Sequence, residues 1–406
     1  MSLHVLEKLA ATNQDCEIWW DSSPLVYAGW KAEVLANAPA EKRADWDAQL
    51  TRLFDPAQIQ AEGTMGFRGV TTNPPLSLQA IQADPAFWAE EIRAMAARMD
   101  PSDIEGIYWA IYLDVVRRGA EMVRPVFDKS GGKYGYVSGQ VDPRFVTEGE
   151  RMLAQGLELA AIAPNVMVKI PGSKEGYEVI EELTARGIST NNTTSFTVPQ
   201  YVACMNAVSR GLERAKAAGI DLGRWRSVIT HMSARLGNVG DLKIQAEARG
   251  VVLSPEEITL GELAVLKRAY RYGKEIGHPS KMLQCSMRVA DEGPGGKASS
   301  WHISKIAGGD FVYTCPPGYI AQLMKAEDRL EPFDANAIDE DAPAEVIEKL
   351  MRIPYFRHAY EFDGMKPEEF CRFGAFSTTA TEFAAATRRT VDFVAQSVES
   401  MLRRVA

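Results

Sequence analysis

The sequence has few cysteines, and none of them is placed as a pair. Its 406 residues contain five cysteines, no two of which stand in the C-x-x-C spacing of a zinc or redox site. Their wide separation and apolar surroundings indicate buried, reduced thiols rather than a disulfide framework. The five histidines show no spacing typical of metal ligands, and we interpret each as structural. The sequence therefore predicts no metal site.

Long apolar runs and an excess of positive charge are also missing. No stretch reaches the roughly 18 apolar residues of a membrane span. The N-terminus carries Glu7 and Lys8 and has no apolar signal core. A net charge of −9 argues against nucleic acid or an anionic membrane as the main partner, although it allows a local cationic pocket. We expect a cytoplasmic protein that spans no membrane.

What the sequence does contain is a regular alternation of short β-like runs and helical patterns. Apolar residues make up 46% of the chain, as in an ordinary globular protein. Eight β-like runs separated mostly by helical stretches predict an α/β fold, namely a (β/α)8 barrel with extra helices. The predicted strands are residues 17–21, 69–73, 135–141, 166–170, 188–196, 227–232, 282–288 and 311–315.

The chain shows no repeat, low-complexity tract or linker, so we predict a single domain over residues 1–406. From about residue 319 to 406 the sequence predicts a C-terminal extension that packs on the barrel. Its last part, residues 378–405, has a helical pattern, and the sequence leaves open whether this helix covers the barrel mouth. A glycine-rich stretch at 291–298 lacks the full spacing of a phosphate-binding loop, and we interpret it as an ordinary loop at the active-site end.

Lys169 is the most informative residue. It lies in the apolar run 165–172, which is rich in Val and Ile and too short for a helix, and therefore indicates a buried strand. Burial lowers the pKa of an amine, and a neutral lysine can attack a carbonyl and form a Schiff base. The alternative is a lysine at a strand end that reaches water or pairs with a carboxylate.

The segment after Lys169 completes a strand–helix–strand unit. Ser173 is placed as an N-cap and Gly187 as the C-cap of the intervening helix. Strand alternation turns Lys169 inward in a barrel, and it turns Asn191 and Thr193 inward together. Polar groups at the carboxyl ends of several strands therefore gather where barrel enzymes carry their chemistry.

Other strand ends add to this set, although each residue alone has an ordinary explanation. Asp21 would serve as an N-cap, and Asn73 before proline as a turn residue. The same alternation predicts that Ser286 and Arg288 face inward together, whereas isolated arginines often form surface ion pairs. It is the joint placement around one lysine that predicts a site.

Several spaced motifs resemble the transaldolase family. They are residues 69–74, 141–144, 168–171 and 188–197, in the family's order and one to a strand, and the resemblance covers roughly residues 15–320. It implies a (β/α)8 barrel that transfers a dihydroxyacetone unit between sugar phosphates, in the manner of the pentose phosphate pathway. It implies neither a metal nor an organic cofactor, and it allows a homodimer, for which the residues give no surface signature.

The resemblance also implies roles for individual residues. Lys169 would form the imine with the donor carbonyl, and Asp21 would take the proton from the C4 hydroxyl during carbon–carbon cleavage. Thr193 would position a catalytic water, together with Gln140. The implied substrate-binding residues are Asn73, Asn191, Thr230, Arg235, Ser286 and Arg288, of which the first two hold hydroxyls and the last three bind the phosphate.

Three features depart from the transaldolase pattern. Gln140 stands where transaldolases have a glutamate and where the related fructose-6-phosphate aldolases have glutamine, which cannot accept a proton. Met232 replaces an aromatic residue. Asn192, Thr194 and Ser195 are more polar than the leucines usual in that strand. We therefore expect a pocket unlike that of a standard pentose-phosphate enzyme.

Three hypotheses follow for the function. The first is a Schiff-base transferase of the transaldolase type that acts on an anionic ketose. The second, which Gln140 favours, is an aldolase that releases free dihydroxyacetone without needing an acceptor. The third is a non-catalytic sugar-phosphate binding protein on the same scaffold, and the retention of both Lys169 and Asp21 speaks against it.

Overall fold

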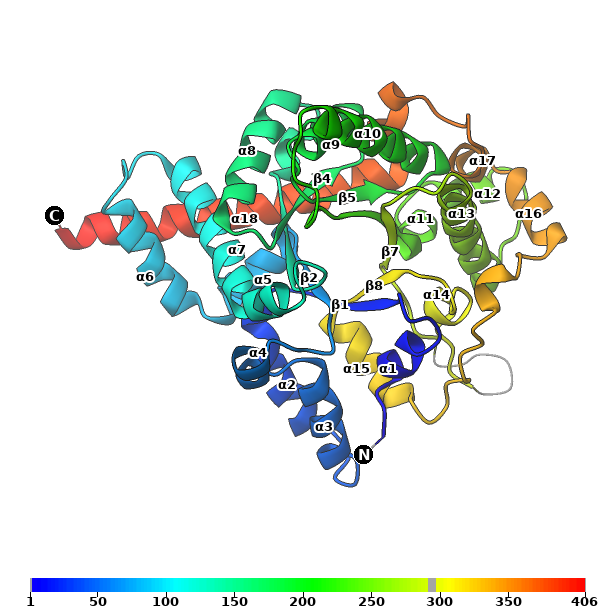
Figure 1. The fold of residues 1–406 in the computed structure, drawn as a ribbon, viewed down its shortest axis with the longest axis horizontal. Coiled ribbons are helices and arrows are strands. Elements are labelled where there is room, and N and C mark those ends of the chain that lie inside the picture. Colours follow the sequence, from blue (N-terminus) through cyan, green and yellow to red (C-terminus); the bar gives the residue numbers. More distant parts are fainter. Residues whose placement is uncertain (1, 291–296, 406) are drawn as a thin grey trace.

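The computed structural model describes residues 2–290 and 297–405, so most of the glycine-rich stretch lies outside the described residues. Eight parallel strands form a closed barrel in chain order, and β8 pairs back with β1. This confirms the predicted (β/α)8 architecture (Figure 1). The strands are β1 (Glu17–Asp21), β2 (Gly69–Thr71), β3 (Tyr136–Gln140), β4 (Val166–Pro171), β5 (Thr190–Ser195), β6 (Ser227–Met232), β7 (Lys281–Cys285) and β8 (Val312–Cys315).

The strands lie where the sequence predicts them, with shifted ends. Every residue of β4 is buried, as expected for a strand covered by helices on one face and by the barrel interior on the other. In the ladder, Lys169 pairs with Gln140 of β3 and with Asn191 of β5. Since paired residues of neighbouring strands share a face, these three side chains lie at one height in the barrel. β7 ends at Cys285, three residues before the predicted end.

Helices surround the barrel and extend its connections. The α-helices are α1 (Val5–Ala10), α2 (Tyr27–Ala36), α3 (Arg43–Leu53), α4 (Pro56–Glu62), α5 (Pro74–Ala83), α6 (Pro85–Ala96), α7 (Ile104–Lys129), α8 (Gly149–Ile162), α9 (Lys174–Ala185), α10 (Val198–Ala217), α11 (Ser233–Asn238), α12 (Leu242–Glu247), α13 (Pro255–Glu275), α14 (Trp301–Ser304), α15 (Pro317–Ala326), α16 (Ala344–Met351), α17 (Pro354–Tyr360) and α18 (Gly374–Val405). Short 3-10 helices are η1 (Pro24–Val26), η2 (Pro143–Phe145), η4 (Ala337–Asp339) and η5 (Pro367–Arg372).

Side-chain caps start helices α5 and α9, which follow β2 and β4. Asn73 Oδ1 accepts a hydrogen bond from the backbone N–H of Leu76 at 2.9 Å, and Pro74 follows at the first helical position of α5. The predicted N-cap of α9 is confirmed, because Ser173 Oγ accepts from the N–H of Gly176 at 3.0 Å. Gly187 adopts a φ of 73°, the left-handed conformation that ends many helices.

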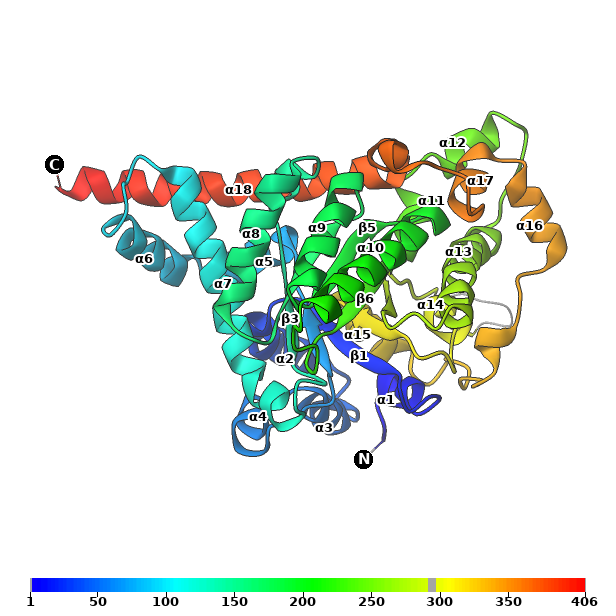
Figure 2. The same ribbon diagram turned by 45° about the horizontal axis from the view of Figure 1, so that its top comes forward.

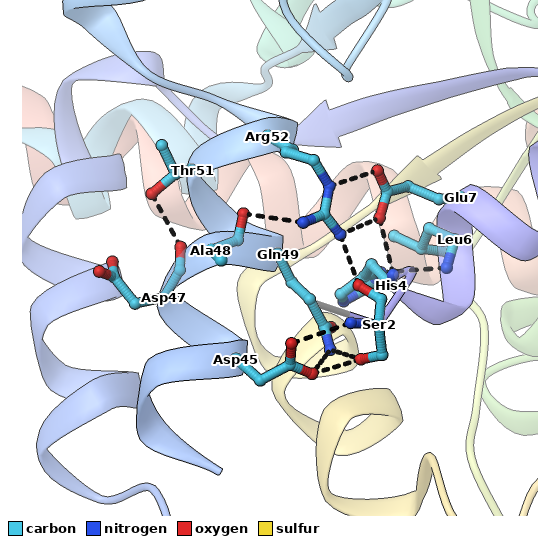
Figure 3. A network of polar contacts seen from close by, with 10 residues as sticks. All are labelled: Ser2, His4, Leu6, Glu7, Asp45, Asp47, Ala48, Gln49, Thr51 and Arg52. Carbon is cyan, nitrogen blue, oxygen red and sulfur yellow. Dashed lines mark hydrogen bonds and ion pairs between the residues drawn. The ribbon is translucent and has the colours of Figure 1, made fainter.

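A polar network fastens the N-terminal segment to α3 (Figure 3). Arg52 donates to the Glu7 carboxylate at 2.9 and 2.8 Å and to the carbonyl oxygen of Ser2 at 2.7 Å. Asp45, on the same helix, accepts from the backbone N–H of Ser2 at 2.9 Å. These contacts hold residues 2–7 against a helix more than 35 residues away in sequence, because each of the three charged side chains has a hydrogen-bond partner.

The C-terminal helices pack on the barrel. α16 and α17 contact α13, and α18 contacts α5, α6, α7, η2 and β5. In Figure 2, α18 is the long red helix that runs along the upper edge of the molecule past α7, α8 and α9. Its buried face carries small and apolar residues, including Phe383, Ala386 and Val394. Within residues 2–290 and 297–405, no helix has the length and apolar character needed to cross a membrane.

Candidate active site

A cavity of about 400 Å³ lies at the carboxyl ends of the barrel strands. This is the end where barrel enzymes place their chemistry. The barrel residues that line it are Asp21, Asn73, Lys169, Thr230, Met232, Arg235, Leu283, Cys285, Ser286 and Thr314. Pro75 and Leu76 of α5 and Glu382, Phe383 and Arg389 of α18 complete the lining. The cavity thus gathers six of the ten residues predicted from the sequence: Asp21, Asn73, Lys169, Thr230, Arg235 and Ser286.

Lys169 projects from β4 into this cavity with only 5% of its surface exposed. Its Nζ donates one hydrogen bond, to the carbonyl oxygen of Thr72 at 3.2 Å. Burial lowers the pKa of Lys169 below its usual value, and the negative charge of Asp21 opposes that shift only in part. A larger fraction of neutral amine, which is the nucleophilic form, is therefore present than in a solvated lysine.

Asp21 ends β1 and lines the same cavity. Thr71 donates a hydrogen bond to Asp21 Oδ1 at 2.6 Å, and the Thr71 and Thr314 hydroxyls are 2.5 Å apart. Burial raises the pKa of Asp21, while the charge of Lys169 and the Thr71 hydrogen bond oppose the rise. A raised pKa moves a carboxyl group toward the pH range in which it can both accept and return a proton.

A chain of hydrogen bonds holds the polar side chains of β3, β5 and β6 across the barrel interior. Asn191 donates from Nδ2 to Ser138 Oγ at 2.9 Å, and Thr230 donates to Asn191 Oδ1 at 2.8 Å. All three residues are buried. Because its partners fix the Asn191 amide, the residue is held rigidly beside Lys169, its neighbour in the ladder.

Gln140 and Thr193 have buried polar atoms without partners. Gln140 Oε1 and Thr193 Oγ1 make no hydrogen bond within the described residues. Gln140 pairs with Lys169 in the ladder, and Thr193 pairs with Pro171, two residues further along β4. Buried polar atoms are usually satisfied, so a pair of unsatisfied ones near a candidate nucleophile suits an ordered water.

Arg235 and Arg288 do not meet in one pocket. Arg235 lines the cavity of Lys169. Arg288 lines a neighbouring cavity of about 330 Å³, where its Nη2 contacts Glu262 Oε2 at 2.7 Å and Thr259 Oγ1 at 3.2 Å. The expectation that Ser286 and Arg288 face inward together is wrong. Alternation stops with β7 at Cys285, and Ser286 then adopts a φ of 56° that redirects the chain.

The unusual polar residues of β5 also lie outside the cavity. Ser195 Oγ donates to Asn192 Oδ1 at 2.6 Å and lies 3.2 Å from the Tyr177 hydroxyl of α9. Thr194, with a φ of 51°, accepts from the N–H of Gly172 at 3.2 Å. Here the ladder between β5 and β6 shifts register, so these side chains satisfy one another between the strand and α9. They do not line the cavity of Lys169.

Sequence reasoning missed several lining residues. Thr314 and Cys285 lie at strand ends, and burial raises the pKa of Cys285 to about 12, which keeps its thiol protonated. Met232 lies in the cavity, as its replacement of an aromatic residue suggested. Glu382 and Arg389 come from α18, whose position over the barrel mouth has no signal in sequence beyond its helical pattern. The helix does cover part of the mouth.

The arrangement combines a buried amine, a carboxyl group that can transfer a proton, and an arginine in one cavity. Such a set can form an imine with a carbonyl compound, move a proton on that compound and hold an anionic group. Within residues 2–290 and 297–405, no group of three or more His, Cys, Asp or Glu side chains is arranged to hold a metal. The closed barrel and this cavity define a (β/α)8 barrel protein with a lysine at its carboxyl end.

Comparison with known proteins identifies the family. The family model described as "Transaldolase/Fructose-6-phosphate aldolase" matches residues 53–364. The chain therefore belongs to this family. The match does not include β1 with Asp21, nor α18.

Named relatives agree with this assignment. "Transaldolase 1" of Streptomyces avermitilis is 39% identical over 178 residues, which cover 43% of this chain and 46% of the relative. "Transaldolase" of Thiobacillus denitrificans is 30% identical over 231 residues, 56% of this chain and 62% of the relative. "Transaldolase" of Saccharopolyspora erythraea is 35% identical over 263 residues, 61% of this chain and 69% of the relative. For the first two relatives the chain spans only about half to three fifths of their length.

Proposed function

We propose that this protein is a transaldolase. It transfers a dihydroxyacetone unit from an anionic ketose, such as a ketose phosphate, to an aldose phosphate through a Schiff base on Lys169. The observation that carries this proposal is the buried Lys169, with its pKa lowered, in the same cavity as Asp21 and Arg235. Family membership and the names of the relatives support it.

In the first step the neutral amine of Lys169 attacks the ketose carbonyl at C2. Loss of water from the carbinolamine gives a protonated imine. Lys169 is suited to this step because burial favours its uncharged form. Asn73, which lines the cavity, and Asn191, which is fixed by Ser138 and Thr230, would hold the hydroxyls of the three-carbon unit.

In the second step Asp21 takes the proton of the C4 hydroxyl. The C3–C4 bond breaks, its electron pair moves toward the iminium nitrogen to give an enamine, and the aldose leaves with a new carbonyl at the former C4. The enamine then attacks the aldehyde of the acceptor, which regains the proton from Asp21, and water releases the new ketose from Lys169. A raised pKa suits Asp21 to both directions of proton transfer.

A second candidate function is an aldolase that releases free dihydroxyacetone. Gln140, whose Oε1 has no partner within the described residues, favours it. Glutamine and Thr193 together can hold a water for hydrolysis of the enamine-derived imine, but glutamine cannot take its proton. The two functions differ in whether an acceptor aldehyde is needed for turnover.

The test is borohydride trapping with fructose 6-phosphate, with and without erythrose 4-phosphate, read by peptide mass spectrometry. A transaldolase gives a three-carbon adduct on Lys169 that the acceptor discharges. An aldolase releases dihydroxyacetone at the same rate without acceptor. No adduct with any ketose phosphate, together with binding of these sugars, would replace both functions by non-catalytic sugar-phosphate binding.

We extend the proposal to the context of the protein. It acts in the cytoplasm on sugar phosphates, in carbohydrate metabolism of the pentose phosphate type. Residues 1–406 form one domain with the C-terminal extension from about residue 319. Light scattering of the purified protein tests a homodimer, and limited proteolysis tests the single domain, because a separate extension would be released intact.

A further inference from the structure

The last helix brings charged side chains to the candidate active site. Glu382 and Arg389 of α18 both line the cavity of Lys169. They are seven residues apart, or two helical turns, so they lie on one side of α18 about 10 Å apart along its axis. Ala385 lies between them on that side.

One nitrogen of the Arg235 guanidinium is already engaged by this helix. Its Nη1 contacts Glu382 Oε2 at 2.6 Å and donates to Thr379 Oγ1 at 3.2 Å. Its guanidinium carbon also lies 5.9 Å from the centre of the Phe383 ring. Three residues of α18 therefore surround the arginine that was expected to bind the substrate phosphate. The Glu382 carboxylate therefore competes with an anionic substrate group for Nη1 of Arg235.

Arg288, the second predicted phosphate ligand, is also committed elsewhere. Its guanidinium pairs with the fully buried carboxylate of Glu262, in the neighbouring cavity. Breaking this pair would leave Glu262 with one partner fewer in a buried place, which is costly. His302 Nε2, at 2.8 Å, is the other group that contacts that carboxylate oxygen.

Arg389 differs from both of these arginines. Its guanidinium makes no hydrogen bond and no ion pair within the part of the chain that the structure describes, and the residue is exposed. A guanidinium presents a planar set of donors that matches the oxygens of a phosphate or carboxylate. Of the two arginines that line the cavity, Arg389 is thus the one with no donor engaged within the described residues, whereas Arg235 uses its Nη1.

We propose that Arg389 of α18 is the residue that binds the terminal anionic group of the substrate. Glu382, by holding Arg235, reduces the positive charge available at the same end of the cavity. The C-terminal helix thereby sets the specificity of the pocket for a phosphorylated sugar, although it lies outside the residues matched by the family model. This inference rests on the proposed function, because it assigns a substrate-binding residue to that reaction.

The test compares Arg389→Gln with Arg388→Gln. Arg388 is the preceding residue of α18, is also exposed, and does not line the cavity, so it is a matched control for charge and helix stability. We expect Arg389→Gln to raise KM for fructose 6-phosphate about tenfold with little change in kcat, as for loss of a charged hydrogen bond. Unphosphorylated fructose should respond equally to both variants. A KM for fructose 6-phosphate within twofold of wild type would overturn the assignment.

A further variant should change KM in the opposite direction. Glu382→Gln removes the carboxylate that holds Arg235, so it should lower KM for fructose 6-phosphate, whereas a purely structural role of α18 would raise it in both variants. An increase of KM in Glu382→Gln equal to that in Arg389→Gln would contradict the role of Glu382.

Binding of inorganic phosphate separates this inference from the proposed function. Isothermal titration calorimetry on the wild type, Arg389→Gln and Arg388→Gln needs no turnover. Weaker binding in Arg389→Gln alone supports the anion site even if no adduct forms on Lys169. Equal binding in all three proteins overturns it, even if Lys169 is trapped normally in each.

Discussion

Two carboxylates on one strand show how the two ends of the barrel differ. Glu17 begins β1 and Asp21 ends it, and alternation puts them on the same face. Burial acts on both. At Glu17 the cations of Arg226 and Lys281, at 2.5 and 2.9 Å, outweigh it and lower the pKa below its usual value. At Asp21 burial prevails and the pKa is raised.

The carboxylate at the start of β1 is structural, whereas the one at its end is suited to proton transfer. Glu17 also accepts a hydrogen bond from Trp19 Nε1 at 3.0 Å, so its charge is fully compensated inside the fold. Asp21 has one hydroxyl donor and a lysine whose own pKa is lowered by burial. Underpaired buried ions cost stability, and they are typical of sites where a proton or a nucleophile is needed.

The largest expected effect comes from removing the nucleophile. Lys169→Met should reduce turnover by a factor on the order of 10⁴ or more and abolish borohydride trapping, because no other amine replaces it in the imine. Activity assays and peptide mass spectrometry measure both. Lys174→Met, a change at a half-exposed lysine on the next helix, is the control and should keep wild-type activity. Full activity in Lys169→Met would contradict the Schiff-base mechanism.

Asp21→Asn should separate imine formation from bond cleavage. Turnover should fall by roughly 10²- to 10⁴-fold, because the amide cannot accept the C4 proton. Imine trapping should persist, and its pH profile should move to lower pH, since the Asp21 carboxylate raises the pKa of Lys169 and its loss lowers that pKa further. A profile that moves to higher pH would show that Asp21 does not act on Lys169 in this way.

Glu17→Gln tests the carboxylate at the other end of β1. It should lower the free energy of unfolding at pH 7 by about 2 kcal/mol, because Arg226 and Lys281 lose a buried counter-ion. Kinetic constants should not change. A carboxylate with a lowered pKa contributes stability that is lost as the pH falls through its folded-state pKa. The difference in free energy of unfolding between wild type and Glu17→Gln should therefore close below about pH 4.5. Urea unfolding at several pH values measures it, and equal stability at pH 7 would refute the structural role.

Gln140→Glu adds an ionisable group beside Lys169 and tests whether a carboxylate there changes the fate of the intermediate. The carboxylate can move a proton through a water held with Thr193. The ratio of dihydroxyacetone units transferred to the acceptor to those released free should therefore change by roughly two- to tenfold. The ratio of the two products, measured with and without acceptor, reports it. Gln140→Ala, which removes the group without adding a charge, is the control. Identical ratios in all three proteins would mean that Gln140 does not influence the fate of the intermediate.

Much of the barrel could be predicted from the sequence because its strands are short apolar runs with a strong pattern. Lys169 stood out for the same reason, since a single charge in a run such as β4 is rare. Alternation then placed Lys169 in the barrel interior. These inferences depend only on local sequence and on the closed parallel topology, which the alternation of elements predicts.

Where the prediction was wrong, the cause is backbone geometry. Ser286 adopts a positive φ, which residues other than glycine rarely do, and it ends the alternation on which the facing of Arg288 was predicted. Arg288 therefore turns to Glu262 instead of the cavity. The position of α18 depends on contacts with helices far away in sequence, so the part played by Arg389 was outside the reach of pattern reasoning.

The central claim is that burial at the carboxyl end of the barrel lowers the pKa of Lys169 and so raises its fraction of neutral amine. The most direct measurement is trace acetylation over a series of pH values, quantified for the Lys169 peptide by mass spectrometry, with the exposed Lys216 as internal reference. The account predicts a midpoint for Lys169 below the usual lysine value of 10.5, and a lower one still in Asp21→Asn. A midpoint at or above 10.5 would contradict it, because Lys169 would then be an ordinary ammonium ion.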